Sequence, residues 1–253
     1  LREYLALKVE RDQLNSTSLQ RHLTSIRQFM KWANEGRHLD MNPANDFKFK
    51  RQTRPLPGMI DIETVQQILD QAAPEKPVDQ QLWLRDKAIL ELLYSSGLRL
   101  AEVQGLCIRD VDFSRQLLRI TGKGNKTRII PFGSKAKDSL IEWLKVYRIW
   151  QGEFQPESHI FISRNGNPLS ARQIEKRVKM QAQRSGVSVD LHPHLLRHCF
   201  ASHMLSNSGD LRAVQEMLGH SSLSTTQIYT QLDFERLAQV YDQTHPRAHK
   251  DPV

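Results

Sequence analysis

Apolar residues recur every three or four positions along most of this chain, which predicts a mainly helical protein. Residues 1–35 place their apolar side chains on one helix face, and Gly36 is suited to end that helix. The same spacing predicts further helices from Asp61 to about Gln71, over Leu84–Ser96 before Gly97, from near Arg99 to Leu106, over Ser134–Trp150, from a capping box at Ser170 through Ala182, and as short helices after Pro193 with breaks at Gly209 and Gly219.

The hydrophobic period changes between the helices that end near Leu106 and begin at Ser134. Gln116–Gly122 and Thr127–Phe132 are short runs of β-type residues, and a glycine-containing segment joins them. Two such runs with a short polar connection predict an antiparallel β-hairpin. The expected fold class is therefore mainly α with a small antiparallel β-sheet (α+β).

A polar stretch divides the chain into two parts. The helical pattern disappears over residues 42–58, where four lysines and arginines lie between Pro43 and Pro55. We expect a helical N-terminal part over residues 1–47, a basic linker over residues 48–57 and a larger domain over residues 58–253. The linker charge suits a strap along a phosphate backbone, and a simply solvated linker fits the composition equally well.

Composition and charge narrow the class of partner. The 253 residues include 36 lysines and arginines against 28 aspartates and glutamates, a formal net charge of +8. This balance favours a polyanion such as nucleic acid, although a basic protein with no nucleic-acid role is also compatible with it. Cys107 and Cys199 form neither a disulfide framework nor a CxxC metal motif, which favours a reducing, cytoplasmic setting. No apolar run approaches the roughly 18 residues that a membrane span requires.

Six chemically active side chains stand in a fixed order along the larger domain. A tyrosine hydroxyl is a poor nucleophile at neutral pH. Two arginines, two histidines and a lysine are the groups needed to make it attack a phosphodiester without a metal. The six candidates are Arg99, Lys123, His194, Arg197, His220 and Tyr229.

Each candidate also has an ordinary structural explanation when it is taken alone. Arg99 is compatible with a surface ion pair to Glu102, which would contribute little stability. His194 and Arg197 share an early helical face and are compatible with a solvated basic surface. A lone hairpin lysine is usually solvated, and a lone tyrosine is usually half-buried. Two neighbouring histidines are expected to serve structure or DNA contact: His192 and His198.

The joint occurrence of the six residues resembles the tyrosine recombinase (lambda-integrase-like) family, whose active site is Arg, Lys, His-x-x-Arg, His/Trp and Tyr. The resemblance extends over nearly the whole chain, and the residues around the motifs favour the branch of the family that resolves bacterial chromosome dimers. The beginning of the chain resembles only the C-terminal half of the family's helical core-binding (SAM-like) domain, so residues 1–47 are expected to be a partial one. The matching motifs are Gly97-Leu98-Arg99, His192–His198, Leu218-Gly219-His220 and Leu223–Thr230.

The resemblance implies a covalent mechanism. Tyr229 would attack the scissile phosphate and form a 3′-phosphotyrosyl link while a 5′-hydroxyl leaves, which preserves the bond energy and requires no ATP. Fixed cationic side chains make a divalent metal redundant, so no cofactor is expected. Arg99 and Arg197 would stabilise the negative charge on the non-bridging phosphate oxygens, and Lys123 would protonate the leaving 5′ oxygen. His194 would assist proton transfer at the tyrosine, and His220 would form a hydrogen bond with a non-bridging oxygen.

The resemblance also implies partners. They are double-stranded DNA with a dif-like recombination site, a second related recombinase in a heterotetramer, and an FtsK-type DNA translocase as activator. A C-terminal exchange helix at about residues 234–244 would dock on a neighbouring protomer, whereas its apolar face is equally compatible with packing on its own domain. A phage or transposon integrase, a type IB topoisomerase and a catalytically silent DNA-binding module remain as alternatives.

Overall fold

The structure, a computed structural model, describes residues 2–14, 16–36, 38–39, 44, 60–122, 127–219 and 231–249. For residues 2, 16, 17 and 231–235 it describes the backbone without the side chains. The chain divides into two compact units, Leu1–Pro57 and Gly58–Val253. The predicted basic linker, residues 48–57, lies outside the described residues.

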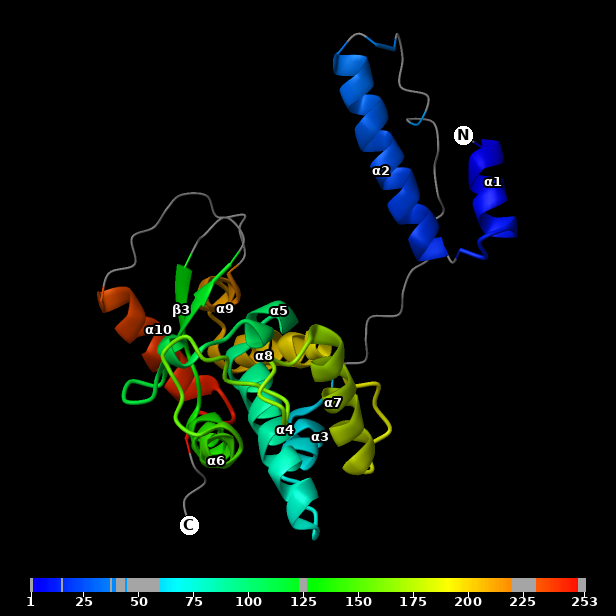
Figure 1. Cartoon of the computed structure of the whole chain (residues 1–253). Helices are drawn as coiled ribbons and strands as arrows, with labels where there is room; N and C mark the ends of the chain where they lie inside the picture. The colour runs from blue at the N-terminus through cyan, green and yellow to red at the C-terminus, as the bar shows by residue number, and fades with distance from the viewer. Residues whose placement is uncertain are drawn as a thin grey trace. The chain divides into compact units, whose positions relative to one another are not determined.

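The first unit contains a pair of packed helices (Figure 1). Leu5 from the first helix contacts Leu19 and Leu23 from the second, and all three side chains are buried. The second helix ends directly before Gly36, as predicted, but the single helix expected over residues 1–35 was wrong: the chain turns after Glu10, and a second helix begins at Ser16. The two helices are α1 (Arg2–Glu10) and α2 (Ser16–Glu35).

The second unit is mainly helical, and its helices surround one long central helix (Figure 1). The described helices are α3 (Ile62–Leu69), α4 (Pro77–Ser96), α5 (Leu100–Gln104), the 3-10 turn η1 (Ile108–Asp110), α6 (Ser134–Gln151), α7 (Ala171–Arg184), α8 (Pro193–Ser208), α9 (Leu211–Leu218) and α10 (Gln231–Thr244). The central helix is α4, which packs against α6, α7 and α8. Because α4 is covered on several sides, its hydrophobic residues do not form a single stripe.

Three short strands form an antiparallel sheet in the order β1-β2-β3. They are β1 (Val111–Asp112), β2 (Leu117–Thr121) and β3 (Thr127–Pro131). The pairing of Thr121 with Thr127 sets the register of the hairpin that the sequence predicted. β1 was not predicted, because two residues are too few to show an alternating pattern. The expected fold class, mainly α with a small antiparallel sheet, is confirmed.

Helix ends follow capping residues that are visible in the sequence. Asp61 begins α3 by accepting the backbone N–H of Thr64 at 2.6 Å. Ser170 begins α7 with the predicted capping box. The predicted start of α4 at Leu84 was wrong: the helix begins at Pro77, where proline is favoured, and its first turns are too polar to show a period.

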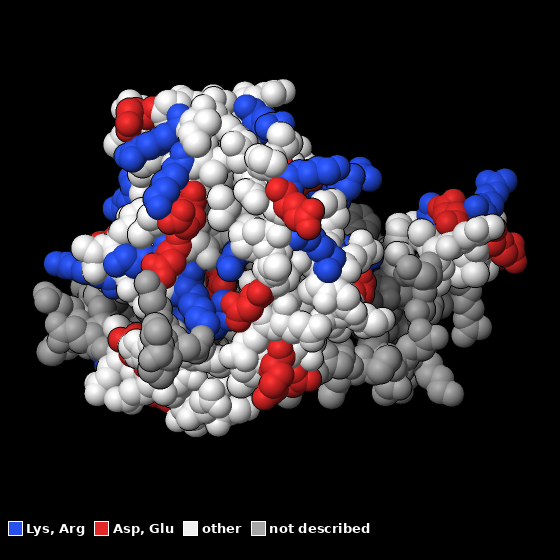
Figure 2. Space-filling view, turned by 90° about the horizontal axis from the view of Figure 1, so that it is seen from below, with Lys and Arg blue, Asp and Glu red and all other residues white. Residues whose placement is uncertain are grey.

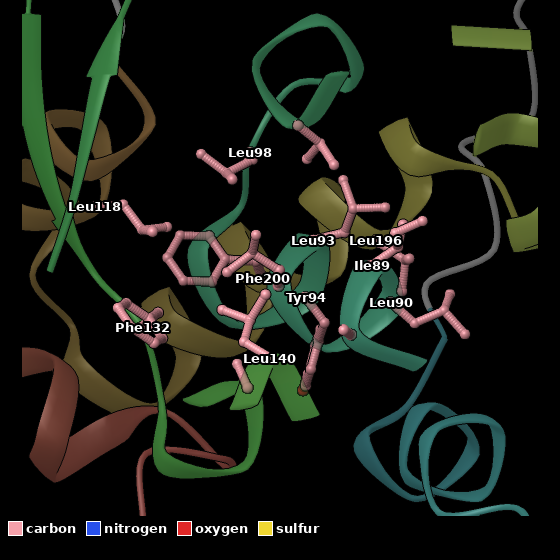
Figure 3. Packing of buried hydrophobic residues seen from close by; sticks show 14 of the residues in the cluster. Ile89, Leu90, Leu93, Tyr94, Leu98, Leu118, Phe132, Leu140, Leu196 and Phe200 are labelled. Carbon is pink, nitrogen blue, oxygen red and sulfur yellow. The ribbon is translucent and has the colours of Figure 1, made fainter. Parts of the chain in front are cut away.

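One hydrophobic core joins the sheet to α4, α6 and α8 (Figure 3). Phe200 of α8 is fully buried among Leu98, Leu118 and Phe132 in this core. A Cβ atom on Gly97 would lie 2.4 Å from the Phe200 ring, so only glycine allows this close approach. The core therefore fixes the end of α4, from which the chain leads to Arg99.

The C-terminal helix α10 packs on its own unit. Leu237 and Tyr241 are buried, and α10 contacts α8, α9 and β3. Beyond the helix, the carbonyl of Ala248 accepts the backbone N–H of Ser134 at 2.9 Å. Among the described side chains of α10, the apolar residues Leu237 and Tyr241 are therefore covered by the same unit, and docking of this helix on a neighbouring protomer stays a prediction.

Surface charge is mixed in sign. Lysine and arginine side chains lie beside aspartate and glutamate side chains on the face in Figure 2. Exposed pairs such as Lys179–Asp190, at 2.8 Å, contribute little to stability. Net charge alone therefore does not locate a binding site. Within the described segments, no helix combines the length and the apolar character needed to cross a bilayer.

Candidate active site

Arg99 is placed by the junction between α4 and α5. Gly97 ends α4 in the left-handed conformation, at φ 58°, and the side chain of Leu98 is fully buried. Arg99 then caps the start of α5. Its side chain stays 42% exposed, so its guanidinium can reach a ligand from solvent.

The carboxylate of Glu102 lies at the centre of this region and is only 7% exposed. It accepts the backbone N–H of Arg99 at 2.8 Å and the Arg99 Nη1 at 2.9 Å. Arg128 of β3 donates to both carboxylate oxygens, each at 2.8 Å. Burial by itself would raise the pKa of Glu102, but the hydrogen bonds from Arg128 and Arg99 outweigh it and lower that pKa. The alternative of a simple surface pair between Arg99 and Glu102 does not hold.

Arg197 reaches the same region from α8. Pro193 occupies the start of this helix, and Arg197 follows one turn later. The Arg197 Nη1 donates to the carbonyl of Gly97 at 2.5 Å, and its Nη2 donates to the carbonyl of Leu218 at 2.7 Å. One guanidinium therefore connects the end of α4 to the end of α9.

Arg99 and Arg197 come together at the end of α9. The helix stops at Gly219, which has a left-handed φ of 65°. The Arg99 Nη2 approaches the Gly219 carbonyl at 3.4 Å, next to the Leu218 carbonyl that Arg197 binds. Two arginines predicted from separate motifs thus meet on adjacent peptide groups.

This arrangement holds like charges close together. Burial, and then the neighbouring guanidinium of Arg99, lower the pKa of Arg197 to about 10, which leaves it protonated at neutral pH. The charge of Arg128 also lowers the pKa of Arg197, whereas the negative charge of Glu102 raises it. A phosphate would offset the excess positive charge, because guanidinium groups bind phosphate oxygens in a bidentate manner.

The histidines at the start of α8 differ in their surroundings. His192 caps the helix: its Nδ1 accepts the backbone N–H of Leu195 at 3.1 Å. This agrees with the structural interpretation of His192. His194 and His198 are exposed, and His194 lies in the first turn of α8, before Arg197. An imidazole in that place is accessible to a ligand that Arg197 binds.

The structure describes only part of the predicted catalytic set. Arg99, His194 and Arg197 belong to described elements, and two of them, Arg99 and Arg197, are brought together. The other three lie in segments 123–126 and 220–230, which follow β2 and α9 and are outside the described residues. These three remain predictions: Lys123, His220 and Tyr229.

Arg128 was missed by the sequence analysis. Its backbone lies in β3, where the burial alternates so that Arg128 and Ile130 are both buried. An arginine at an inward position of a strand requires a buried carboxylate partner. The signal available in the sequence was the spacing of Arg128 two residues before Ile130 in a predicted strand, but it did not identify Glu102 as the partner.

Fixed cationic side chains supply the charge in this region. Among the described residues, no group of three or more histidine, cysteine, aspartate or glutamate side chains is arranged to hold a metal ion. Glu102 itself is engaged by Arg99 and Arg128. The described part of the region therefore offers anion binding through its arginines.

Comparison with protein families and individual proteins gives strong matches. The Phage integrase family model matches residues 59–236. The tyrosine recombinase XerC of Histophilus somni is 46% identical over 246 residues, which cover 97% of this chain and 80% of that protein. The tyrosine recombinase XerC of Chromobacterium violaceum is 46% identical over 253 residues, which cover 99% of this chain and 81% of that protein.

A solved structure has a similar fold. It is the XerH site-specific recombinase bound to a palindromic difH substrate in a post-cleavage complex. The TM-score is 0.69 at 22% sequence identity, and the match covers 95% of this chain and 70% of that chain. At this identity the likeness concerns the fold alone, and it agrees with a mainly helical unit that carries a small sheet.

Proposed function

The chain belongs to the phage integrase family and is a tyrosine recombinase, and we propose that it cuts and rejoins DNA through a covalent link to Tyr229. The observation that carries this proposal is the meeting of Arg99 and Arg197 at the end of α9. The chain continues from there directly into segment 220–230, which contains the tyrosine. A phosphate held by both arginines would therefore be within a short segment of its nucleophile.

In the proposed reaction, the Tyr229 oxygen forms a bond to the scissile phosphorus while the bond to the 5′ oxygen breaks. A free 5′-hydroxyl and a 3′-phosphotyrosyl link result, and the reverse reaction with another 5′-hydroxyl rejoins the strands. Arg99 and Arg197 stabilise the additional negative charge on the non-bridging oxygens. Loss of one such donor typically slows a reaction by about 100- to 1000-fold.

Proton transfer is assigned to the remaining candidates. Lys123 would protonate the leaving 5′ oxygen, and His194 would assist proton removal from the tyrosine. His220 would donate a hydrogen bond to a non-bridging oxygen. The exposed place of His194 at the start of α8 supports its part of this proposal.

We further propose the substrate and the partners. The similarity to XerC proteins favours double-stranded DNA with a dif-like site and a XerD-like recombinase in a heterotetramer. An FtsK-type translocase would activate the assembly, and the reaction would take place in the cytoplasm during chromosome partition. The first unit would contribute as a core-binding region, in which α1 and α2 contact DNA.

A nicked suicide substrate tests the proposed chemistry. Cleavage near the nick releases a short strand, so rejoining fails and the covalent protein–DNA adduct accumulates. We expect the adduct with the wild-type chain on a dif-like half-site and no adduct with Tyr229→Phe. Tyr147→Phe is a matched control, because Tyr147 lies in α6, outside the candidate site and the proposed DNA contacts, and it should leave the adduct yield unchanged.

The same assay separates the enzyme from a silent binding module. Tight binding of the wild-type chain to the half-site without any covalent adduct would contradict the proposal. An adduct that persists in Tyr229→Phe would contradict the choice of nucleophile while leaving the reaction class in place.

A further inference from the structure

We propose that Arg128 is a positioning residue for this reaction: it occupies the carboxylate of Glu102 and thereby keeps the guanidinium of Arg99 available for the scissile phosphate. The inference rests on the proposed function, because it concerns how one of the phosphate-binding arginines is held. Arg128 itself is only 10% exposed, so it acts from beneath the site and does not reach the DNA.

The first support is the division of hydrogen bonds at Glu102. Arg128 uses Nη1 for one carboxylate oxygen and Nη2 for the other, both at 2.8 Å. Arg99 makes one side-chain hydrogen bond to the same carboxylate, from Nη1 at 2.9 Å. A carboxylate facing a single arginine forms the paired, fork-like interaction that is strongest for these groups. Arg128 already holds Glu102 in that way.

This division has two consequences for Arg99. Its hydrogen bond to Glu102 uses Nη1, and its Nη2 approaches the Gly219 carbonyl at 3.4 Å. The charge of Glu102 is also offset by Arg128, so Arg99 keeps its own positive charge for an anion. Without Arg128, Arg99 would turn onto both oxygens of Glu102, so its donors would be occupied and its positive charge would be compensated by that carboxylate.

The second support is the contact between Arg128 and the end of α9. The Arg128 Nε donates to the carbonyl of Met217 at 3.2 Å. A Cβ atom on Gly219 would lie 2.9 Å from Cδ and 3.0 Å from Nε of Arg128, so the arginine packs directly under this turn. The same guanidinium thus holds Glu102 and packs under the Gly219 turn, whose carbonyl the Arg99 Nη2 approaches.

A purely structural role makes a different prediction. If Arg128 only stabilised the fold, its loss would slow the reaction by the same factor whatever residue stands at position 99. If it acts through Arg99, its loss should matter much less once Arg99 has been replaced. A double-mutant cycle measures this difference.

The experiment uses the whole chain and the single-turnover rate of adduct formation on the nicked half-site at saturating DNA. We expect Arg128→Gln to slow this rate by about tenfold or more, with the half-site Kd changed by about twofold at most. In the Arg99→Lys background, Arg128→Gln should slow the rate by less than about threefold. Arg119→Gln is the matched control, because Arg119 is an exposed arginine of the same sheet with a carboxylate at 3.7 Å, and its rate should stay near wild type.

Thermal unfolding of each variant accompanies the rates. Arg128→Lys provides a second variant: it keeps the positive charge, but one ammonium group cannot hold both oxygens of Glu102 and the Met217 carbonyl. If Arg128→Gln is unfolded at the assay temperature, the double-mutant cycle is measured with Arg128→Lys instead. Arg128→Lys should then slow adduct formation more when Arg99 is present than in the Arg99→Lys background.

Two results would overturn the inference alone: a folded Arg128 variant with the wild-type rate, or an equal loss of rate with either residue at position 99. A wild-type chain that binds the half-site and forms no adduct would overturn the proposed function, and this inference with it.

Discussion

Two arginine–carboxylate clusters in the second unit have opposite charge balance. In the first, at the end of α9, three guanidinium groups surround one described carboxylate, and one of the three is substantially exposed. In the second, under the C-terminal tail, one buried guanidinium faces two carboxylates. The first cluster consists of Arg99, Arg128, Arg197 and Glu102, and the second of Arg247, Glu91 and Asp70.

The tail cluster engages the side-chain donors of its buried arginine. Arg247 donates to Asp70 at 2.9 and 2.8 Å and to Glu91 at 2.8 Å, with a further short contact to Glu91. Burial by itself would lower the pKa of Arg247, but its hydrogen bonds to Asp70 and the charge of Glu91 raise it. The hydrogen bond from Arg247 also lowers the pKa of Asp70. With two carboxylates facing one guanidinium, this site does not favour an anion.

The difference shows how similar residues serve two purposes. An arginine whose charge is cancelled inside the protein fixes the fold, and here it attaches the tail to α3 and α4. An arginine held beside other arginines, with donors open to solvent, prepares a site for an anion. Replacement of an arginine should therefore change the reaction rate in the first cluster and the stability in the second.

The largest expected effect is on the reaction rate of Arg197→Lys. A single ammonium group cannot replace the paired donors, so adduct formation should slow by about 100-fold or more. The unfolding free energy should fall by about 1.5–3 kcal/mol, the value of one hydrogen bond from a charged donor, because lysine can keep only one of the two carbonyl contacts. Single-turnover rates and urea unfolding check both values. A rate that falls only in proportion to the unfolded fraction would contradict the assignment of Arg197 to the phosphate.

The next effect is on the stability of Arg247→Met. This change leaves Glu91 buried without its partner, and loss of one member of a buried pair typically costs about 3–5 kcal/mol. Urea unfolding should show this loss, and Arg247→Met combined with Glu91→Gln should regain part of it. Under conditions where the variant is folded, its adduct rate should be close to wild type. Wild-type stability in Arg247→Met would show that the tail is not attached through this cluster.

A smaller effect concerns pH and His245, which is stacked on Tyr241 at 4.8 Å between ring centroids. Burial lowers the pKa of His245 from 6.5 to about 3. His245 therefore binds a proton near pH 6.5 in the unfolded chain but only near pH 3 in the folded chain. The free energy of unfolding should consequently fall as the pH falls from about 6.5 to about 3. The contribution of one such group is about 1.4 kcal/mol per pH unit.

Urea unfolding between pH 6 and pH 4.5 would measure this slope. His245→Gln should reduce the slope relative to wild type. His203 remains in the variant, and because burial lowers its pKa as well, it should continue to contribute in the same direction. Parallel curves for wild type and His245→Gln would exclude His245 as a source of the acid sensitivity.

The smallest effect compares two glycines with the same backbone angle. Gly209 and Gly219 both end helices at φ 65°, so alanine should cost about 1–2 kcal/mol of strain at either position. A Cβ atom at Gly209 meets nothing within 4 Å, whereas one at Gly219 meets Arg128. Gly219→Ala should therefore slow adduct formation in addition, while Gly209→Ala should not. Equal rates in the two folded variants would argue against a link between this turn and the arginines.

The sequence predicted local structure better than distant contacts. Gly97, Gly209 and Gly219 marked helix ends because a left-handed residue is a local requirement. The pair of Arg128 and Glu102 was not predicted, because the two residues are 26 positions apart and on different kinds of element. Local periodicity contains no information on which buried charge faces which.

The candidate site shows the same limit. Motifs identified Arg99 and Arg197 from their neighbours in sequence, and the structure brings these two together. The role of Glu102 as a shared buried carboxylate depends on the Arg128 side chain, which reaches from β3 to Glu102 of α5 and to the Met217 carbonyl of α9, and no single segment specifies these contacts. The attachment of the tail through Arg247 likewise depends on residues from α3 and α4.

The measurement that tests the central claim most directly is the identification of the residue that carries DNA after cleavage. The adduct formed on the nicked half-site is digested with nuclease and then with trypsin, and the peptides are sequenced by mass spectrometry. The peptide that follows Arg212 and ends at Arg236 contains Tyr229 as its only tyrosine. We predict that this peptide carries the nucleotide, attached at Tyr229. A nucleotide attached to any other residue would contradict the account.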